Sequence, residues 1–264
     1  MKLTVLCDNN TFIDQYYLGE PALCFYLENG DDCILFDTGY SDVFMRNAIK
    51  MGIDLDQVNK IVLSHGHNDH TGGLVHYLKE KRNVELITHP DTFIHREDET
   101  GMISSPLSVK EVGEKCHLHL TKEPCEISRN LIYLGEIPVS CDFEKRIPIG
   151  KTGNGEDDFI LDDSALVYQG KDGIFIITGC SHSGICNIIE YAKKITGTEK
   201  VTGVIGGFHL LKEGERLNHT IEYLKKQNIK NLYPCHCVSL KAKIAMANEM
   251  EIQETGTGLS IEIG

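Results

Sequence analysis

The sequence predicts a mixed α/β protein of the four-layer αββα type, in which two β-sheets lie face to face with helices outside them. Three observations favour this fold class. The first half contains a series of short β-branched or aromatic runs separated by turn residues, and the second half alternates strands with helices. In addition, polar residues follow several apolar strands, which is where sites in layered α/β folds usually lie.

The first half is predicted to be rich in strands. The Asn29-Gly30 dipeptide indicates a tight hairpin between the second and third strands. The predicted strands are 3–7, 22–27, 33–36, 61–63 and 84–88, and the predicted helices are 41–51 and 74–81.

The second half is predicted to repeat strand and helix more regularly. Its first two strands form a hairpin across a Gly-Lys-Asp-Gly turn. The predicted strands are 165–168, 174–178, 201–205, 231–233 and 259–263, and the predicted helices are 184–194, 213–227 and 239–249. Between the halves, region 90–160 has few clear periods. We expect it to be an insertion or lid within a single domain spanning 1–264, with short strands at 116–120 and 131–134.

Composition limits the class of protein. The chain has 264 residues, of which 41% are apolar, so a sizeable core is expected. No apolar run approaches the ~20 residues of a membrane helix, and residues 1–7 predict an opening strand rather than a signal peptide. Because no export signal is expected, the ten scattered cysteines are expected to be reduced thiols, which indicates a cytoplasmic protein. The net charge of −13 opposes nucleic-acid binding, so a small molecule is the expected partner; homo-oligomerisation is left open.

The most distinctive motif runs from His65 to His70 and follows the predicted strand at 61–63. It reads His-Gly-His-Asn-Asp-His and continues as Thr-Gly-Gly. His65 and His67 project from one face of extended backbone, and Asp69 and His70 can face the same space from the start of a helix. Imidazole nitrogens and a carboxylate oxygen suit zinc and related divalent metals. The alternative, a polar loop with Asp69 as a helix cap, is less consistent with this spacing.

Two further strand ends carry candidate residues for a metal site. Asp37 follows strand 33–36 in an Asp-Thr-Gly turn, where it is either a turn residue or a group that holds a metal ligand in place. The run Gly-Cys-Ser-His-Ser-Gly follows strand 174–178. Here His182 is the preferred ligand and Cys180 the fallback, and the alternative for such a histidine is a cap or a packed polar group.

Two later strand ends carry histidines as well. His209, in Gly-Gly-Phe-His, is a candidate for substrate binding or proton transfer, or else a histidine in a glycine turn. His236 lies in Pro-Cys-His-Cys between a strand and a helix. Cys235 and Cys237 are expected beside the site rather than as ligands, because a cysteine-rich site favours a closed structural zinc.

Together these motifs resemble the metallo-β-lactamase superfamily, and within it the branch similar to dihydropterin-ribofuranosylaminobenzene-phosphate synthase. The resemblance covers nearly the whole chain and implies the αββα fold named above. It rests on residues 65–73, 134–138, 143–144, 179–187, 206–210 and 234–237.

The resemblance also implies roles for individual residues. His65 and His67 would bind one metal, and Asp69 and His70 a second, with Asp69 also orienting a water between them. The Asp-x-Gly of the family lies beneath the metals, which gives Asp37 its supporting role.

Later ligands follow from the same resemblance. Many members bring a bridging aspartate where this chain has Cys180, so the bridging ligand stays open. A last histidine ligand after a late strand implies His236.

The implied function is a metal-dependent hydrolase that uses a hydroxide activated by two divalent metals, zinc first, with manganese or iron as alternatives. Asp69 and His209 are the expected catalytic residues. Asp69 would orient the hydroxide or move its proton, and His209 would polarise the substrate or protonate the leaving group. The expected substrate is a small phosphorylated or pterin-like molecule. Two alternatives are a di-iron redox protein, which the retained His67 disfavours, and a ligand-binding or sensor protein on the same fold.

Overall fold

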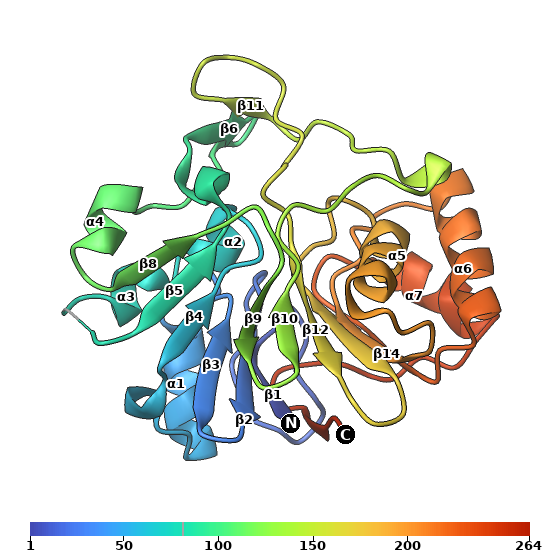
Figure 1. Ribbon diagram of the computed structural model, residues 1–264, viewed down its shortest axis with the longest axis horizontal. Helices are drawn as coiled ribbons and strands as arrows, with labels where there is room; N and C mark the ends of the chain where they lie inside the picture. The colour runs from blue at the N-terminus through green and yellow to red at the C-terminus, as the bar shows by residue number, and fades with distance from the viewer. Residues whose placement is uncertain (81) are drawn as a thin grey trace. The chain divides into compact units, whose positions relative to one another are not determined.

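The computed structural model describes residues 1–80 and 82–264, and the chain divides into two compact units (Figure 1). Unit 1 comprises Met1–Lys122, Pro148–Asp162 and Gly256–Ile263, and unit 2 comprises Glu123–Ile147, Asp163–Thr255 and Gly264. Each unit contains a β-sheet and the helices that pack on it. The single-domain organisation inferred from the sequence stays a prediction.

Unit 1 is built on a seven-stranded sheet in the order β16-β1-β2-β3-β4-β5-β8. The strands are β1 (Lys2–Cys7), β2 (Cys24–Asn29), β3 (Asp32–Phe36), β4 (Lys60–Val62), β5 (Glu85–Thr88), β8 (His117–Leu120) and β16 (Ser260–Glu262). The strands from β16 to β3 pair antiparallel, whereas β3, β4, β5 and β8 pair parallel. Because parallel strands end at one edge of a sheet, the loops after β3 and β4 are neighbours.

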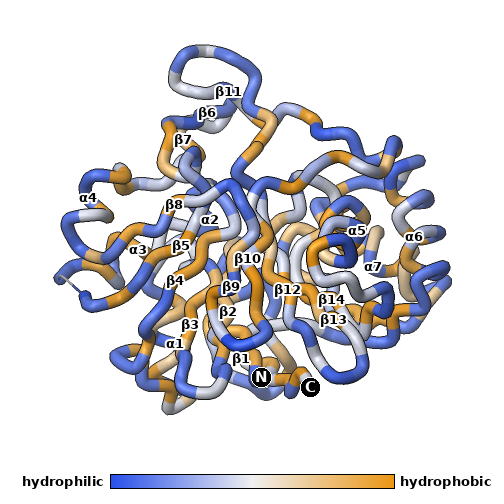
Figure 2. Tube along the Cα trace, viewed as in Figure 1, coloured by the Kyte–Doolittle hydropathy of each residue, from blue (hydrophilic) through white to orange (hydrophobic). Residues whose placement is uncertain are grey.

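One face of this sheet packs against the helices of unit 1. Tyr26, Leu35, Ile61 and Leu86 are paired in register across β2 to β5 and are all buried in one cluster. Burial of one such side chain stabilises the fold by roughly 1.5–3 kcal/mol. Figure 2 shows the apolar character of these strands. The helices are α1 (Val43–Met51), α2 (Asn68–Thr71), α3 (Leu74–Tyr77) and α4 (Val109–Gly113).

Unit 2 is built on a six-stranded sheet in the order β15-β14-β13-β12-β10-β9. The strands are β9 (Cys125–Ser128), β10 (Leu131–Tyr133), β12 (Ala165–Gln169), β13 (Ile174–Thr178), β14 (Val201–Gly206) and β15 (Asn231–Pro234). β13, β14 and β15 are parallel, so their ends also share one edge. Val167, Ile176, Val204 and Leu232 form a continuous apolar row on one face. It packs in one core with α5 (Ile185–Thr196), α6 (Glu215–Gln227) and α7 (Leu240–Ala247).

Within region 90–160, three strands join the two larger sheets, and the insertion expected here stays a prediction. Strand β8 extends the sheet of unit 1, because its backbone pairs parallel with β5, and β9 and β10 extend the sheet of unit 2. Only β6 (Arg96–Asp98), β7 (Gly101–Met102) and β11 (Lys151–Thr152) form a small sheet of their own within the described part of the region. A lid role for this region stays a prediction.

The other predicted strands and helices are confirmed with small shifts at their ends, except the helix expected at 74–81. That helix ends at Tyr77, because the chain turns back so that Arg82 Nε donates to the Tyr77 carbonyl at 2.9 Å and its guanidinium stacks on the Tyr77 ring. Lys81, the predicted end of the helix, lies outside the described residues. Among the described helices, none combines the length and the apolar character that a membrane crossing requires.

Candidate metal centre

In unit 1, candidate ligands gather where β3 and β4 end, around the fully buried Asp37. The Asp37 carboxylate accepts three hydrogen bonds, two of them from Ser64: Oδ1 from Ser64 N at 2.7 Å and Oδ2 from Ser64 Oγ at 2.8 Å. The third comes from His70 Nδ1, 2.7 Å from Asp37 Oδ2. Since a carboxylate only accepts, His70 carries its proton on Nδ1 and presents Nε2 as a lone pair.

His65 is oriented through the same carboxylate. Its Nδ1 lies 2.9 Å from Ser64 Oγ. Because the Ser64 hydroxyl donates to Asp37, it accepts from His65 Nδ1–H. His65 therefore also presents Nε2 as a potential ligand atom, and one buried carboxylate sets the tautomers of two histidines.

The spacing of these atoms fits metal ligation. His65 Nε2 lies 3.0 Å from His67 Nδ1, and His70 Nε2 lies 3.7 Å from Asp69 Oδ2. Two nitrogens each about 2.1 Å from a tetrahedral zinc would lie about 3.4 Å apart. Both pairs therefore match the separation of neighbouring ligands on one ion, and the donor atoms are of the kinds that zinc, iron and manganese accept.

In unit 2, the other predicted residues gather where β13, β14 and β15 end. The His182 and His209 rings lie 4.5 Å apart between centroids. A ligand atom of Cys180 and one of His236 lie within 4.8 Å of each other. Cys237 links these loops, since its Sγ accepts from His209 N at 3.3 Å and donates to the Cys180 carbonyl at 3.5 Å. The expected place of Cys237 beside a metal site stays a prediction.

The backbone at these strand ends is unusual. Asp37, Ser181, His209 and His236 have φ values of 60°, 58°, 47° and 49°, in the left-handed region that residues with side chains seldom occupy. Such conformations concentrate at functional sites, because the surrounding structure must hold them against their cost. Close packing contributes, since a Cβ on Gly207 would lie only 2.4 Å from Cys237 Sγ.

The predicted residues thus form one group in each unit. Asp37, His65, His67, Asp69 and His70 belong to unit 1, whereas Cys180, His182, His209 and His236 belong to unit 2.

The sequence did not indicate two buried acids, Asp162 and Asp163, which lie where one segment of unit 1 ends and the next segment of unit 2 begins. Burial raises the pKa of Asp162 to about 7, with a further contribution from Asp158 and an opposing one from Arg96. Burial also raises the pKa of Asp163 above its ordinary value, against the lowering effect of Arg146. The only local signal was a pair of consecutive acids directly before an apolar strand.

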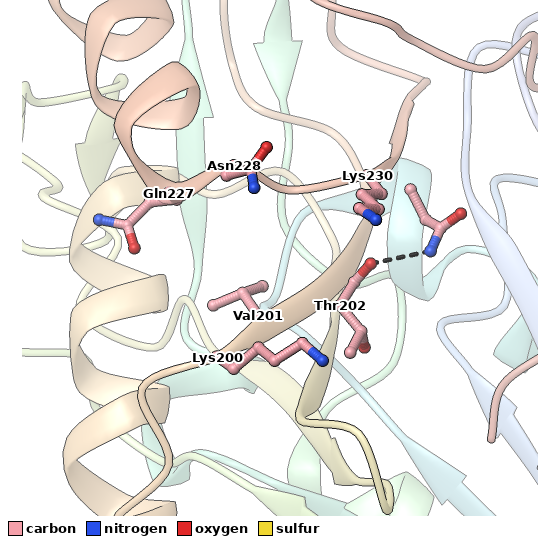
Figure 3. Close-up of a pocket in the computed structure, with 7 residues that line it drawn as sticks. Lys200, Val201, Thr202, Gln227, Asn228 and Lys230 are labelled. Carbon is pink, nitrogen blue, oxygen red and sulfur yellow. Dashed lines mark hydrogen bonds between the residues drawn. The ribbon is translucent and has the colours of Figure 1, made fainter.

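A pocket in unit 2 lies away from the candidate metal ligands of that unit. Its volume is about 330 Å³, and it lies where β14 and β15 begin (Figure 3). His209 and His236 instead follow the ends of those strands. Lys200 and Lys230 line it together with residues from the end of α6.

Comparisons with known proteins bear on the family and the fold of the chain. A family model described as "Metallo-beta-lactamase superfamily" matches residues 18–193. A Methanocaldococcus jannaschii protein named 7,8-dihydropterin-6-methyl-4-(beta-D-ribofuranosyl)-aminobenzene-5'-phosphate synthase is 32% identical over 270 residues, covering 95% of this chain and 92% of that protein. A solved structure described as a metal-dependent hydrolase of the beta-lactamase superfamily is 29% identical, with a TM-score of 0.86 over 100% of this chain and 99% of the other. This whole-chain likeness confirms the predicted fold class.

Proposed function

The chain belongs to the metallo-β-lactamase superfamily, and on this basis we propose that it is a hydrolase of small molecules that uses two divalent metals. The strongest support is the orientation of His65 and His70 by Asp37, because a buried carboxylate that fixes two imidazole tautomers is typical of metal sites. The relative named a synthase shows that names within this family cover more than hydrolysis.

The proposed ligands come from both units. His65 and His67 with His182 would hold one metal, and Asp69 and His70 with His236 the other. We place Cys180 on the second metal, because its ligand atom and that of His236 are close enough to share an ion. Bound divalent metals supply Lewis-acid charge and lower the pKa of water, which is the chemistry that hydrolysis at neutral pH needs.

Two residues are proposed to move protons. Asp69 is partly exposed, with 29% of its side chain accessible, so its carboxylate can accept the proton of an attacking water. His209 is half-buried beside His182 and can donate a proton to a leaving group.

The proposed substrate is a small phosphorylated or pterin-like molecule. The relative's name contains a dihydropterin and a 5'-phosphate. The net charge of −13 would repel an anionic substrate at long range, so the metals would have to provide the attraction. This makes phosphoester turnover depend on metal content.

Metal analysis of the purified protein tests the proposal. We expect about two metals per chain in the wild type and fewer in His67→Ala and in His182→Ala, with loss of turnover of p-nitrophenyl phosphate or a cyclic phosphodiester. His219→Ala is the matched control, since this side chain is half exposed on α6. In cobalt-loaded protein, a thiolate ligand adds an intense near-ultraviolet band, which Cys180→Ser should remove.

Other results would change the conclusion. If the wild type takes up no zinc, manganese or iron, the hydrolase proposal is refuted, and the ligand-binding or sensor protein on the same fold becomes the favoured alternative. Resident iron together with inactivity on phosphoesters would favour the di-iron redox alternative. Loss of metal in His67→Ala alone would move His182 from metal binding to substrate binding.

A further inference from the structure

Two consecutive aspartates, Asp162 and Asp163, each hold the backbone of a loop that carries proposed metal ligands. Asp162 is the last residue of its segment of unit 1, and Asp163 begins the next segment of unit 2. We propose that this pair positions the ligand loops and thereby sets the metal affinity of the protein. The inference rests on the proposed function, because it assumes that these loops bind metal.

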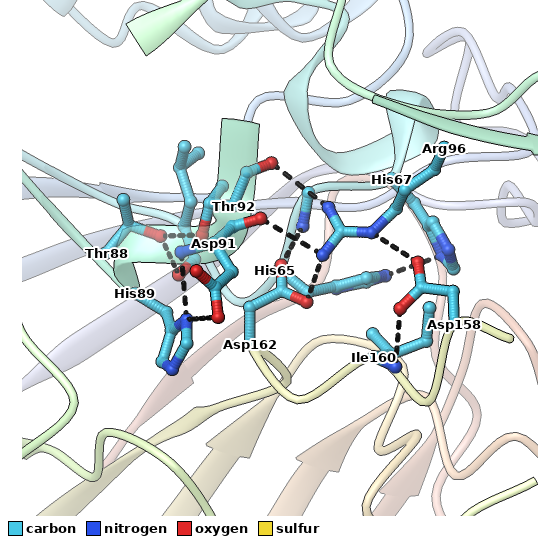
Figure 4. A network of polar contacts seen from close by, with 12 residues as sticks. His65, His67, Thr88, His89, Asp91, Thr92, Arg96, Asp158, Ile160 and Asp162 are labelled. Atoms are coloured by element: carbon cyan, nitrogen blue, oxygen red, sulfur yellow. Dashed lines mark hydrogen bonds and ion pairs between the residues drawn. The ribbon is translucent and has the colours of Figure 1, made fainter. Parts of the chain in front are cut away.

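In unit 1, Asp162 connects the histidine loop to a buried arginine (Figure 4). Its Oδ2 accepts from Gly66 N at 2.8 Å, and Gly66 lies between His65 and His67. Its Oδ1 pairs with Arg96 Nη2 at 2.5 Å. Asp162 and Arg96 are almost wholly buried, so these bonds are not replaced by water.

Arg96 is itself held in one orientation. Its Nε lies 2.6 Å from Asp158 Oδ2, and its Nη1 and Nη2 donate to the carbonyls of Thr92 and Asp91 at 3.2 and 3.1 Å. With every guanidinium nitrogen engaged, Arg96 is a rigid support for the Asp162 carboxylate.

The histidine loop runs directly against this support. A Cβ on Gly66 would lie 1.9 Å from the Thr92 carbonyl oxygen and 2.2 Å from Arg96 Nη1, so only glycine fits there. The backbone between His65 and His67 is therefore held by the hydrogen bond to Asp162 and limited by close packing against Thr92 and Arg96.

In unit 2, Asp163 plays the corresponding part. Its Oδ2 accepts from Ser183 N at 2.9 Å and also from the Ser183 hydroxyl. Ser183 directly follows His182, so this carboxylate holds the loop that presents a proposed ligand. Hydrogen bonds to ionised groups are roughly twice as strong as neutral ones, which suits a carboxylate to this task.

The substitution Asp162→Asn tests the positioning role in unit 1. An amide offers one acceptor and one donor, so one of its two partners, Gly66 N–H or Arg96 N–H, would meet another donor. Loss of groups that support metal ligands typically lowers metal affinity 10–100-fold. We expect at least a tenfold loss of zinc affinity in chelator competition, and a shifted visible spectrum of bound Co²⁺.

Asp163→Asn should have a smaller effect, because one amide oxygen can still accept both Ser183 donors. Asp32→Asn is the control. It removes one carboxylate charge from the ion pair with Lys60 at the start of β3 and β4, whereas the histidine loop follows the end of β4. Zinc affinity should stay within about twofold of the wild type, and the Co²⁺ spectrum should stay unchanged.

The outcomes separate this proposal from the proposed function. Wild type that binds no Zn²⁺ overturns both. If the wild type binds Zn²⁺ tightly and Asp162→Asn is unchanged in affinity and in Co²⁺ spectrum, only the positioning role is overturned. An equal loss of affinity in Asp32→Asn would overturn it too. Should Asp162→Asn not fold, Arg96→Lys carries the test. The single ammonium group of lysine cannot pair with both Asp158 and Asp162, so we expect reduced Zn²⁺ affinity. Unchanged affinity would overturn the proposal.

Discussion

At the scale of single residues, Asp37 is predicted to control metal affinity through the tautomers of two histidines. In Asp37→Asn, the amide oxygen can still accept from Ser64 N, but the amide nitrogen then faces His70 Nδ1–H, donor against donor. Relief of this clash moves the His70 proton to Nε2, the atom proposed to bind metal. We expect zinc affinity to fall 10–100-fold in chelator competition. Asp32→Asn, which removes the same charge at the Lys60 ion pair, should leave affinity within about twofold; an equal loss in both variants would refute a specific role for Asp37.

At the scale of elements, α5 depends on a cap from a distant segment. Its N-cap, Gly184, has no side chain, and Glu144 Oε2 instead accepts from Cys186 N and Asn187 N at 2.8 and 3.1 Å. Glu144→Ala should cost about 2 kcal/mol, a fall of roughly 4–8 °C in the unfolding midpoint by calorimetry. Glu28→Ala, an exposed acid, should cost under about 1 kcal/mol. A Glu144→Ala midpoint equal to that of the wild type would contradict the cap.

The same side chain gives α5 a pH dependence. Burial raises the pKa of Glu144 above its ordinary value of 4.5, although the two backbone N–H groups and Arg216 oppose this. Between the unfolded and folded pKa values, the native state binds more protons than the unfolded chain. The contribution of Glu144 to stability is therefore greatest below pH 4.5 and falls as pH rises through that interval. Glu144→Gln should flatten this part of the stability curve.

At the scale of the whole molecule, the proposed ligands divide between the two units, so metal binding should stabilise the chain as a whole. A ligand that binds only the native state at 100 times its Kd adds about 2.7 kcal/mol, or roughly 5–11 °C for a chain of this size. We expect a chelator to lower the unfolding midpoint and zinc to restore it. Calcium, which prefers all-oxygen sites, is the control and should not restore the midpoint. An unfolding midpoint that does not change with zinc would contradict a metal centre of this kind.

Much of the fold and of the site could be predicted from local sequence. Strands β1 to β5 and β12 to β15 follow from short apolar runs, because most of their residues are buried, and helices α1, α5, α6 and α7 follow from apolar periodicity. The Asn29-Gly30 hairpin follows from turn chemistry, with Gly30 at φ 65°. The motif at 65–70 was apparent because its ligand types lie within six residues. A Ser-x-x-Glu capping box at Ser108 and Glu111 could also have predicted α4, which was missed.

Contacts between distant segments determined the features that the local sequence did not predict. The sequence pattern indicates that 117–120 is extended, but it does not indicate that this strand pairs with β5 of unit 1. Likewise, no local pattern indicates that 125–133 joins the sheet of unit 2. The bonds of Asp162 to Gly66 and of Glu144 to α5 join residues 96 and 42 positions apart. A sequence states which side chains can ionise or donate, and thereby determined the ligand motif and most elements of this protein. Only the tertiary structure decided which carboxylate supports which loop, because burial and partner choice depend on contacts between distant segments.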